Sequence, residues 1–317
     1  MPKGKGCWMP VEGFLQHVSD AFKTGEWWNL PWWREVSDAS DQPEKEIAEK
    51  AFCELRQVFD GAWFREQVPL GSLAHPIAIL LLIKGLVPFQ CLLRLGRALC
   101  AVRNAGLLSG KLRNRLKLPA EFSGVHWEVE IMGYLLSRGF SLAPHAIGAG
   151  NRRADLHVSG SGEEIIIELH RRTAAFPREL AQKNMDWYEK AQPKRLDEIF
   201  ESPEIIGANR AAQDKEADRI FRLLKGGHGK IGQLPDKPGI ILTQPALPFS
   251  LDRLQNHLAR FGESRKCFLG VILVWPHFSG GAIGFSVQWL PNKHAGRAMS
   301  EFAAVRAICE LGEGLAH

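Results

Sequence analysis

The sequence lacks three features that would place the chain in a membrane or in an oxidising compartment. Its longest apolar run, Ile77–Ile83, is far shorter than the roughly 20 residues that a membrane-spanning helix needs. No apolar signal core follows the basic N-terminus. The cysteines show no metal-binding spacing and are scattered along the chain (Cys7, Cys53, Cys91, Cys100, Cys267 and Cys309). We therefore expect a cytoplasmic protein with reduced thiols and no membrane partner.

The sequence also has no internal repeat, no low-complexity tract and no nucleotide-binding phosphate loop. The glycine-rich segment 225–235 lacks both the Walker spacing and the Lys-Ser or Lys-Thr pair that ends such a loop. The chain does have 317 residues, 45% of them hydrophobic, which is enough for two ordinary domains or one large one. Its formal net charge of +5 is compatible with a nucleic-acid partner but does not demonstrate one.

Two short segments with alternating polarity, 153–158 and 165–170, predict a β-hairpin around a turn rich in glycine and serine. Side chains in a strand point alternately to opposite faces, so each strand has one apolar face and one largely polar face. We expect the turn to be centred near Ser161 and Gly162. A slip of one residue would move the apolar row of one strand into water, which favours this register.

This register brings polar side chains together on one face of the hairpin. The opposed pairs are Asp155 with Glu168, Arg153 with His170, and His157 with Ile166. Opposed residues have Cβ atoms roughly 5 Å apart, so the carboxylates of Asp155 and Glu168 would repel each other. A divalent cation such as Mg²⁺ or Mn²⁺ would offset that repulsion through oxygen ligands. The alternative is a surface hairpin whose charges are solvated or pair with Arg153 or Arg171.

A helical pattern closed by a glycine, 125–139, lies upstream of the hairpin and carries an acidic residue near its start. The chain continues with a short strand, an Asp on the next strand and Glu-x-basic on the strand after that. This order of features, beginning with a helix that has an early Glu, resembles the PD-(D/E)XK nuclease-like superfamily, which includes many restriction and repair endonucleases. The resemblance covers about residues 120 to 290. The matching residues are Glu128, Asp155, Glu168 and His170.

The resemblance implies an α/β fold. A helical N-terminal region, residues 1–118, would be followed by a restriction-endonuclease-like α-β-β-β-α-β core with a mixed central sheet. That nuclease-like domain would span residues 119–317 and contain a helical insertion at about 172–208. The insertion carries several lysines and arginines and is a plausible DNA-facing element, although acidic residues between them dilute the field.

The resemblance also implies a metal, an activity and a partner. Asp155, Glu168 and the carbonyl oxygen of Leu169 would hold Mg²⁺ or Mn²⁺. Glu128 would orient a metal-bound water or complete a second metal site. The implied activity is endonucleolytic hydrolysis of phosphodiester bonds, with DNA as the expected partner. The chain could also pair with a second copy as a homodimer.

Two positions depart from the family motif. Ala154 stands where the proline usually stands, which is a harmless variation, and His170 stands where the lysine usually stands. A histidine there could be held cationic, act as a base, bind the metal or mark an inactive site. Three rival functions therefore stay open. The first is an inactive nuclease-fold protein that binds nucleic acid or a protein partner. The second is a hydrolase that holds Zn²⁺ with His157, His170 and the two carboxylates, and the third is a structural domain.

Periodicity and turn signals predict the remaining elements. The segment Trp27–Trp33 could stack nucleic-acid bases, although a hydrophobic lock on the domain is the simpler interpretation. Lys230 or Gln233 could lie near the site, by the same resemblance. The expected helices cover 11–22, 45–59, 76–85, 88–103, 178–191, 195–200, 209–224, 251–261 and 297–311, and the expected later strands cover 239–243, 268–275 and 282–289.

Overall fold

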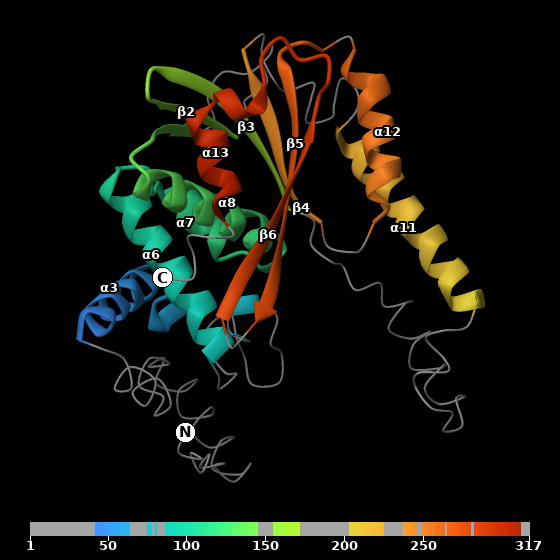
Figure 1. Ribbon diagram of the computed structural model, residues 1–317. Helices are drawn as coiled ribbons and strands as arrows, with labels where there is room; N and C mark the ends of the chain where they lie inside the picture. The colour runs from blue at the N-terminus through green and yellow to red at the C-terminus, as the bar shows by residue number, and fades with distance from the viewer. Residues whose placement is uncertain are drawn as a thin grey trace, which may run out of the picture. The chain divides into compact units, whose positions relative to one another are not determined.

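The computed structural model describes a large part of the chain, in two compact units (Figure 1). One unit comprises Met1–Ser137 with Phe278–Ile283, and the other comprises Arg138–His277 with Gly284–His317. The described residues are 42–63, 75–77, 80, 86–144, 155–171, 203–224, 237–245, 249–263, 265–279 and 282–311. The expected helices 11–22, 178–191 and 195–200, the Trp27–Trp33 cluster, Lys230 and Gln233 lie outside them.

The first unit is helical. The helices expected at 45–59 and 88–103 are confirmed, and each begins two or three residues earlier. The basic connector 111–117 forms a short helix, because Ser109 caps its first turn by accepting a hydrogen bond from the Leu112 N–H at 3.1 Å. The helices are α3 Gln42–Val58, α6 Leu86–Asn104, α7 Gly110–Leu116 and α8 Pro119–Ser137.

Helix α8 begins six residues before the predicted start at 125, with Pro119 in its first turn, where proline is well tolerated. It is buried nearly all round, as expected of a helix whose apolar residues do not form a single stripe. After the helix, Gly139 adopts φ 84°, the left-handed conformation that commonly ends helices. The glycine at 139 therefore predicted the end of the helix well, whereas the start of the helix was predicted six residues too late.

Glycines allow the helices of this unit to approach closely. Helix α6 packs against both α3 and α8. A Cβ atom on Gly96 of α6 would collide with the backbone carbonyl of Ala51 in α3. A Cβ atom on Gly133 of α8 would lie 2.5 Å from the Ala98 Cα atom in α6. Two helix–helix contacts thus depend on the absence of a side chain.

A buried histidine joins two distant segments of the same unit. His75 is 0% exposed, and its Nε2 atom lies 3.0 Å from the carbonyl oxygen of Leu116. Its Nδ1 atom accepts a hydrogen bond from the Ile77 N–H at 3.2 Å. Because Nδ1 accepts, the proton of the neutral ring is on Nε2, which donates to Leu116. The ring is enclosed by the aromatic side chains of Phe59, Trp63 and Phe122.

The second unit contains a six-stranded mixed sheet, so the α/β class is confirmed. Strands β1, β2 and β3 form an antiparallel meander, and β3, β4 and β5 are parallel. The later strands begin where the sequence predicts and extend one to four residues further. In sheet order, the strands are β1 Ser141–Pro144, β2 Leu156–Gly160, β3 Glu163–Arg171, β4 Gly239–Gln244, β5 Phe268–Ser279 and β6 Ala282–Pro291.

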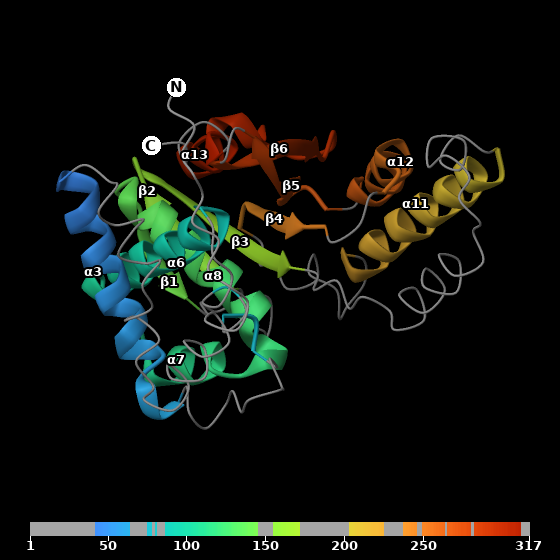
Figure 2. The ribbon, with the colours of Figure 1, turned by 90° about the horizontal axis from the view of Figure 1, so that it is seen from below.

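Helices cover both faces of this sheet (Figure 2). Helices α11, Pro203–Leu224, and α12, Leu251–Gly262, lie on one face and share an apolar cluster with strands β3 to β6. Helix α11 begins six residues before the predicted start at 209, and α12 matches its prediction to one residue. A short helix, α13 Ala303–Cys309, lies on the other face beside β2.

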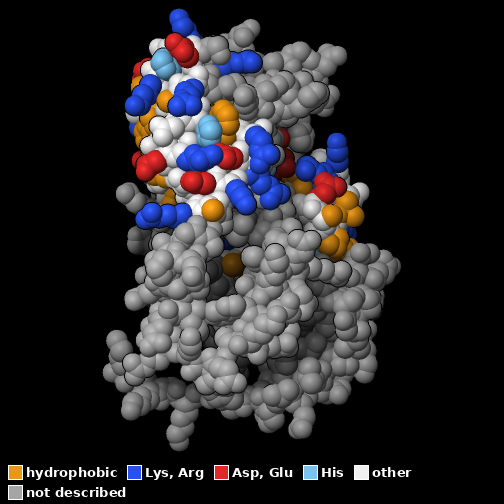
Figure 3. All heavy atoms as spheres, turned by 90° about the vertical axis from the view of Figure 1, so that its right-hand side faces the viewer, with side chains coloured by type: hydrophobic (Ala, Val, Ile, Leu, Met, Phe, Trp, Pro, Cys, Tyr) orange, Lys and Arg blue, Asp and Glu red, His pale blue; other side chains and the backbone are white. Residues whose placement is uncertain are grey.

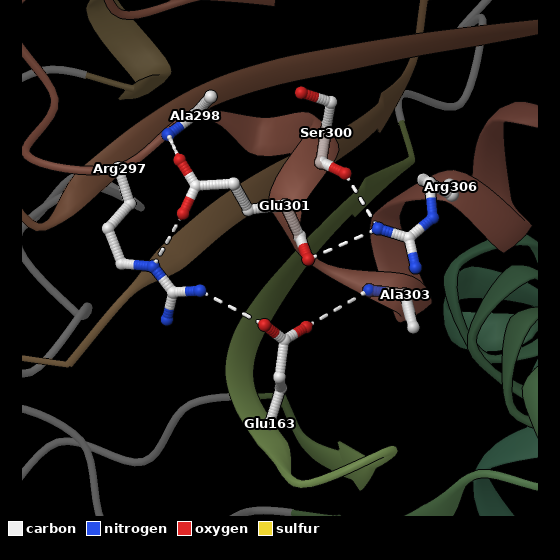
Figure 4. A network of polar contacts seen from close by, with 7 residues as sticks. All are labelled: Glu163, Arg297, Ala298, Ser300, Glu301, Ala303 and Arg306. Carbon is white, nitrogen blue, oxygen red and sulfur yellow. Dashed lines mark hydrogen bonds and ion pairs between the residues drawn. The ribbon is translucent and has the colours of Figure 1, made fainter.

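The C-terminal segment ties α13 to the start of β3 (Figure 4). Glu163, the first residue of β3, accepts hydrogen bonds from Arg297 Nη2 at 3.0 Å and from the N–H of Ala303 at 3.3 Å. Arg297 also pairs with Glu301 at 3.0 Å. The turn end of the hairpin is thereby anchored to the helix that covers it.

The prediction of one continuous helix over 297–311 is wrong. The chain forms a 3-10 turn, η3 Met299–Glu301, and then α13, separated by Phe302 in an extended conformation. The extended residue directs the Phe302 ring into the interior, where it is 1% exposed, and the Arg297 guanidinium lies 4.3 Å from the ring centroid. Burial of this ring outweighs the helical preference of the segment.

Within the described residues, no helix is both long enough and apolar enough to cross a bilayer.

The glycine at the α6–α8 contact gives a stability prediction. Gly133→Ala should destabilise the protein by about 1–3 kcal/mol, because the added methyl overpacks against Ala98. Gly124→Ala on the same helix is the control, because a Cβ there meets nothing within 4 Å. That control should stabilise the protein by about 0.5–1 kcal/mol through lower backbone entropy. Urea unfolding of both variants measures the difference, and equal stability would contradict the close packing.

The buried histidine gives a pH prediction. Burial lowers the pKa of His75 to about 4, although the hydrogen bond to Leu116 opposes the shift. The unfolded chain binds the proton near pH 6.5, so stability should be unaffected above that pH and should fall as the pH drops from 6.5 to 4. The full loss should be about 3 kcal/mol, since each pKa unit is worth about 1.4 kcal/mol. Protonation of Nδ1 would also set two donors, His75 and the Ile77 N–H, against each other.

The measurement is the unfolding free energy of wild type and His75→Gln between pH 7.5 and 4. The wild type should lose more stability than the variant over this interval. His294→Asn, which alters an exposed histidine, should follow the wild-type curve. Parallel curves for wild type and His75→Gln would show that this ring does not control the acid response.

Candidate functional site

The site is built on the β2–β3 hairpin, whose predicted register is confirmed. Ser161 and Gly162 form the turn with φ values of 55° and 77°, the pair of left-handed conformations that a two-residue hairpin turn requires. His157 pairs with Ile166 and Leu156 with Ile167. Continued by one residue, this register sets Asp155 opposite Glu168.

The two acidic residues are interlocked by backbone hydrogen bonds. The Leu169 N–H donates to Oδ2 of Asp155 at 2.8 Å, and the Asp155 N–H donates to Oε1 of Glu168 at 3.3 Å. The chain bends at Asp155, just before β2 begins, so its side chain replaces the backbone carbonyl that would otherwise extend the ladder. Each carboxylate therefore has its position set by the opposite strand.

The face of β3 that carries Glu168 is covered in the fold. Alternation places Ile166, Glu168 and His170 on the face that α11 and α12 cover, and Ile166 belongs to their shared apolar cluster. Glu168 is 0% exposed, whereas Asp155 is half-buried. The sequence indicated a hairpin with one apolar and one largely polar face, and it did not indicate what covers the polar one. In the fold both faces of β3 are buried over residues 165–169.

His170 follows Glu168 by two residues, near the C-terminal end of β3. It is half-buried, and its Nε2 atom is shielded from solvent. The residue directly across from it on β4 is Thr243, which is 1% exposed. Gln244 follows and is also buried, and its Oε1 atom has no hydrogen-bond partner among the described residues. Sequence reasoning placed this strand but overlooked both polar residues. The signal was present: they end an apolar strand at the carboxyl edge of a parallel pair, where ligands usually bind.

His157 does not join the acidic pair. Its Nε2 atom lies 3.3 Å from Oε2 of Glu164, an exposed carboxylate that also accepts a hydrogen bond from Lys237 at 3.0 Å. Lys237, and then His157, lower the pKa of Glu164. No three histidine, cysteine or acidic side chains come together as a metal-binding group in the described part of the chain. The arrangement therefore gives no support to a zinc site made from both histidines.

Glu128 lies on α8, in the other unit, and is buried. Its Oε2 atom is 3.4 Å from Nη1 of Arg115, whose Nε atom pairs with Glu121 at 2.7 Å. An arginine that bridges two carboxylates keeps Glu128 in place on its own helix. The expectation that Glu128 approaches Asp155 and Glu168 stays a prediction.

The donor set suits a hard cation. Carboxylate and carbonyl oxygens are the ligands that Mg²⁺ and Mn²⁺ prefer, and Mg²⁺ is commonly held by only one or two carboxylates, with waters and substrate phosphate completing the shell. Asp155 and Glu168 supply two adjacent carboxylates. The N–H and C=O of a strand residue point to the same neighbour, so the Leu169 carbonyl is directed to the side of Asp155.

Comparison with known proteins found no matching family model, no matching curated protein and no matching solved structure. The case for any function therefore rests on the geometry of this chain and on the residues of its hairpin.

The donor set predicts metal-dependent stabilisation. Millimolar Mn²⁺ should raise the melting temperature of wild type by a few degrees or more, because a ligand bound only to the native state stabilises it. Asp155→Asn and Glu168→Gln should abolish the rise. Asp155→Asn still offers an acceptor to the Leu169 N–H, so its metal-free melting temperature should stay close to that of wild type.

Glu164→Gln is the matched control, because it removes an exposed carboxylate from the same strand and the same face. It should keep the full response to Mn²⁺. A wild-type melting temperature that Mn²⁺ leaves unchanged would count against a metal centre at this hairpin.

Proposed function

We propose that this protein is a metal-dependent nuclease that hydrolyses phosphodiester bonds in DNA. The observation that carries the proposal is the interlock of Asp155 and Glu168 at the end of the hairpin. The order of elements supports it: a helix, a three-stranded antiparallel meander, a second helix and a strand parallel to β3 follow one another as in a restriction-endonuclease-like core. The mildly basic charge of the chain is compatible with a polyanionic substrate.

The chain's own residues would divide the work as follows. Asp155, Glu168 and the Leu169 carbonyl would hold the cation. When bound, Mg²⁺ or Mn²⁺ supplies Lewis-acid charge stabilisation and activation of water. Hydrolysis forms a bond from the water oxygen to phosphorus and breaks the bond from phosphorus to the leaving oxygen, which takes up a proton. His170 would either place a positive charge near the phosphate or accept the proton that the attacking water loses.

A second function is favoured by two observations. Glu168 is fully buried, and histidine occupies the position where the family has lysine. A nuclease fold with this site could bind nucleic acid or a protein without cutting. The two functions differ in a single measurable property, turnover of a phosphodiester bond.

Cleavage of supercoiled plasmid is the direct test. Wild type should nick or linearise DNA with Mg²⁺ or Mn²⁺, and EDTA should stop the reaction. Asp155→Asn and Glu168→Gln should each lower the rate by more than about 10²-fold, since the metal loses a charged ligand. Glu164→Gln should cut at the wild-type rate. Activity that persists in Asp155→Asn would remove the hairpin from the mechanism.

His170 yields a prediction about pH. An imidazole with the ordinary pKa near 6.5 loses its charge at mildly alkaline pH, whereas lysine keeps its charge to about pH 10. If His170 acts as a cation, His170→Lys should extend activity to higher pH, and His170→Ala should cost on the order of 10²-fold. Plasmid cleavage by the three proteins between pH 6 and 9 measures this.

The pattern among the three proteins distinguishes the two functions. Cleavage by His170→Lys alone, with an inert wild type, would identify a disabled nuclease and favour the binding function. Equal rates in wild type, His170→Lys and His170→Ala would show that His170 takes no part in the reaction.

A further inference from the structure

Helix α11 carries a stripe of cations on its solvent side. Lys215, Arg219 and Arg222 are spaced at i, i+4 and i+7, so they project from one side of the helix, and all three are exposed. The opposite side of α11 contributes Ala217 and Ile220 to the apolar cluster on the sheet. We refer to Lys215, Arg219 and Arg222 as the α11 stripe.

Two acids of the same helix, Asp214 and Asp218, contact α12. Asp218 accepts two hydrogen bonds from Arg253, at 2.6 and 2.8 Å, and a third contact from His257 Nε2 at 2.8 Å. Arg253 and then His257 lower the pKa of Asp218 to about 2. Asp214 lies 3.7 Å from Arg253. Asp214 and Asp218 are therefore engaged by α12, and a third acid of the helix, Glu216, is buried.

Structural stability does not account for the stripe. Within the described residues, none of its three cations has an ion pair with an acidic side chain. Like charges at i and i+4 destabilise a helix by roughly 0.2–0.5 kcal/mol per pair. The helix dipole favours a cation in the last turn, which explains Arg222 but neither Lys215 nor Arg219. In the part of the chain that the structure describes, neither ion pairing nor the helix dipole therefore accounts for Lys215 and Arg219.

The basic surface continues onto the end of α12. The two helices run side by side in the same direction, because the Ser250 N–H bonds to Gln213 and the Phe221 ring stacks on His257. Three exposed cations follow at or beyond the last turn of α12: Arg260, Arg265 and Lys266. Figure 3 looks onto the side where α11 and α12 lie and shows Lys and Arg side chains gathered there, with Asp and Glu among them.

We propose that the α11 stripe is a docking surface for the phosphate backbone of a nucleic acid. The stripe spans about 10 Å along the helix, since the rise is roughly 1.5 Å per residue. That length matches about three base pairs of duplex DNA, which rise roughly 3.4 Å each along one strand. Helix α11 covers the face of the sheet that carries Glu168 and His170, so the surface and the candidate site belong to the same side of this unit.

The choice of nucleic acid over an acidic protein rests on the proposed function, and charge complementarity supports it. The stripe offers exposed point charges with no apolar anchor between them. Phosphate contacts of that kind give affinity without sequence preference. The stripe should therefore contribute to binding in a way that depends strongly on salt and only weakly on base sequence.

The test is binding of a fluorescein-labelled 20-base-pair duplex, measured by anisotropy in EDTA so that no cleavage occurs. The variant Lys215→Gln/Arg219→Gln/Arg222→Gln removes the stripe. It should weaken binding on the order of 10-fold or more at low salt and make the slope of log K against log salt about 2 to 3 units shallower, because each phosphate contact contributes about 0.9. Two duplexes of unrelated sequence should show the same change.

The control variant is Arg97→Gln/Lys111→Gln/Arg113→Gln, which removes one lysine and two arginines from exposed positions in the other unit. It should keep the wild-type slope. Both variants should melt at or above the wild-type temperature, since no described contact of the core is lost. Equal weakening in the two variants, or no weakening in the stripe variant, would overturn the proposal.

The assay separates this inference from the proposed function. A wild type that binds DNA through the stripe but never cuts would refute the nuclease and leave the docking surface in place. A wild type that cuts DNA, together with a stripe variant that binds DNA as tightly as wild type, would support the nuclease and refute the docking surface. Binding of polyglutamate through the stripe, with no binding of DNA, would overturn the docking proposal in favour of an acidic protein partner.

Discussion

The register of one hairpin decides which polar side chains meet at the candidate site. Ser161 and Gly162 both adopt left-handed conformations and form a two-residue turn, and Glu163 ties this turn to α13. With the register set in this way, Asp155 and Glu168 meet at the other end of the strands. A slip of one residue would separate the acids and also expose an apolar row. Folding energy and the candidate site therefore depend on the same pairing.

Burial of the acidic pair is unfavourable in free energy, and contacts in the rest of the site must offset it. A carboxylate removed from water is unfavourable unless hydrogen bonds or opposite charges replace the lost hydration. Glu168 is fully buried and receives the Asp155 N–H, while the Leu169 N–H supports Asp155. Two adjacent carboxylates held in this way form a preorganised oxygen site, and a divalent cation is the simplest partner that would reduce their repulsion.

Helix α11 connects the buried and exposed parts of the second unit. Its inner side packs Ala217 and Ile220 onto the sheet, and one flank holds Asp218 against Arg253 of α12. The outer side carries Lys215, Arg219 and Arg222, all three of them exposed. A single amphipathic helix thus combines core packing, a helix–helix clamp and a cationic surface. The three roles occupy different angular positions on the helix, so substitutions can test each one separately.

Local rules in the sequence were sufficient for the hairpin, its turn and its register, because alternation and glycine placement act over a few residues. The α/β class and most helix and strand positions were predictable for the same reason. Local rules failed at the 297–311 segment, where burial of Phe302 splits the expected helix, and at the start of α8. They also missed Thr243 and Gln244, although both end an apolar strand, because their place at the carboxyl edge of a parallel pair depends on pairing between distant segments.

The sequence alone determined which residues share a face of the hairpin, since that depends only on the two-residue period of a strand. Only the tertiary structure decided whether that face is open. Glu168 shares a face of β3 with Ile166, which packs in one apolar cluster with Ala217 and Ile220 of α11, about 50 residues further along the chain. No pattern within a strand encodes what covers it. The register of the acidic pair was therefore predictable from the sequence, whereas the burial of Glu168 was not.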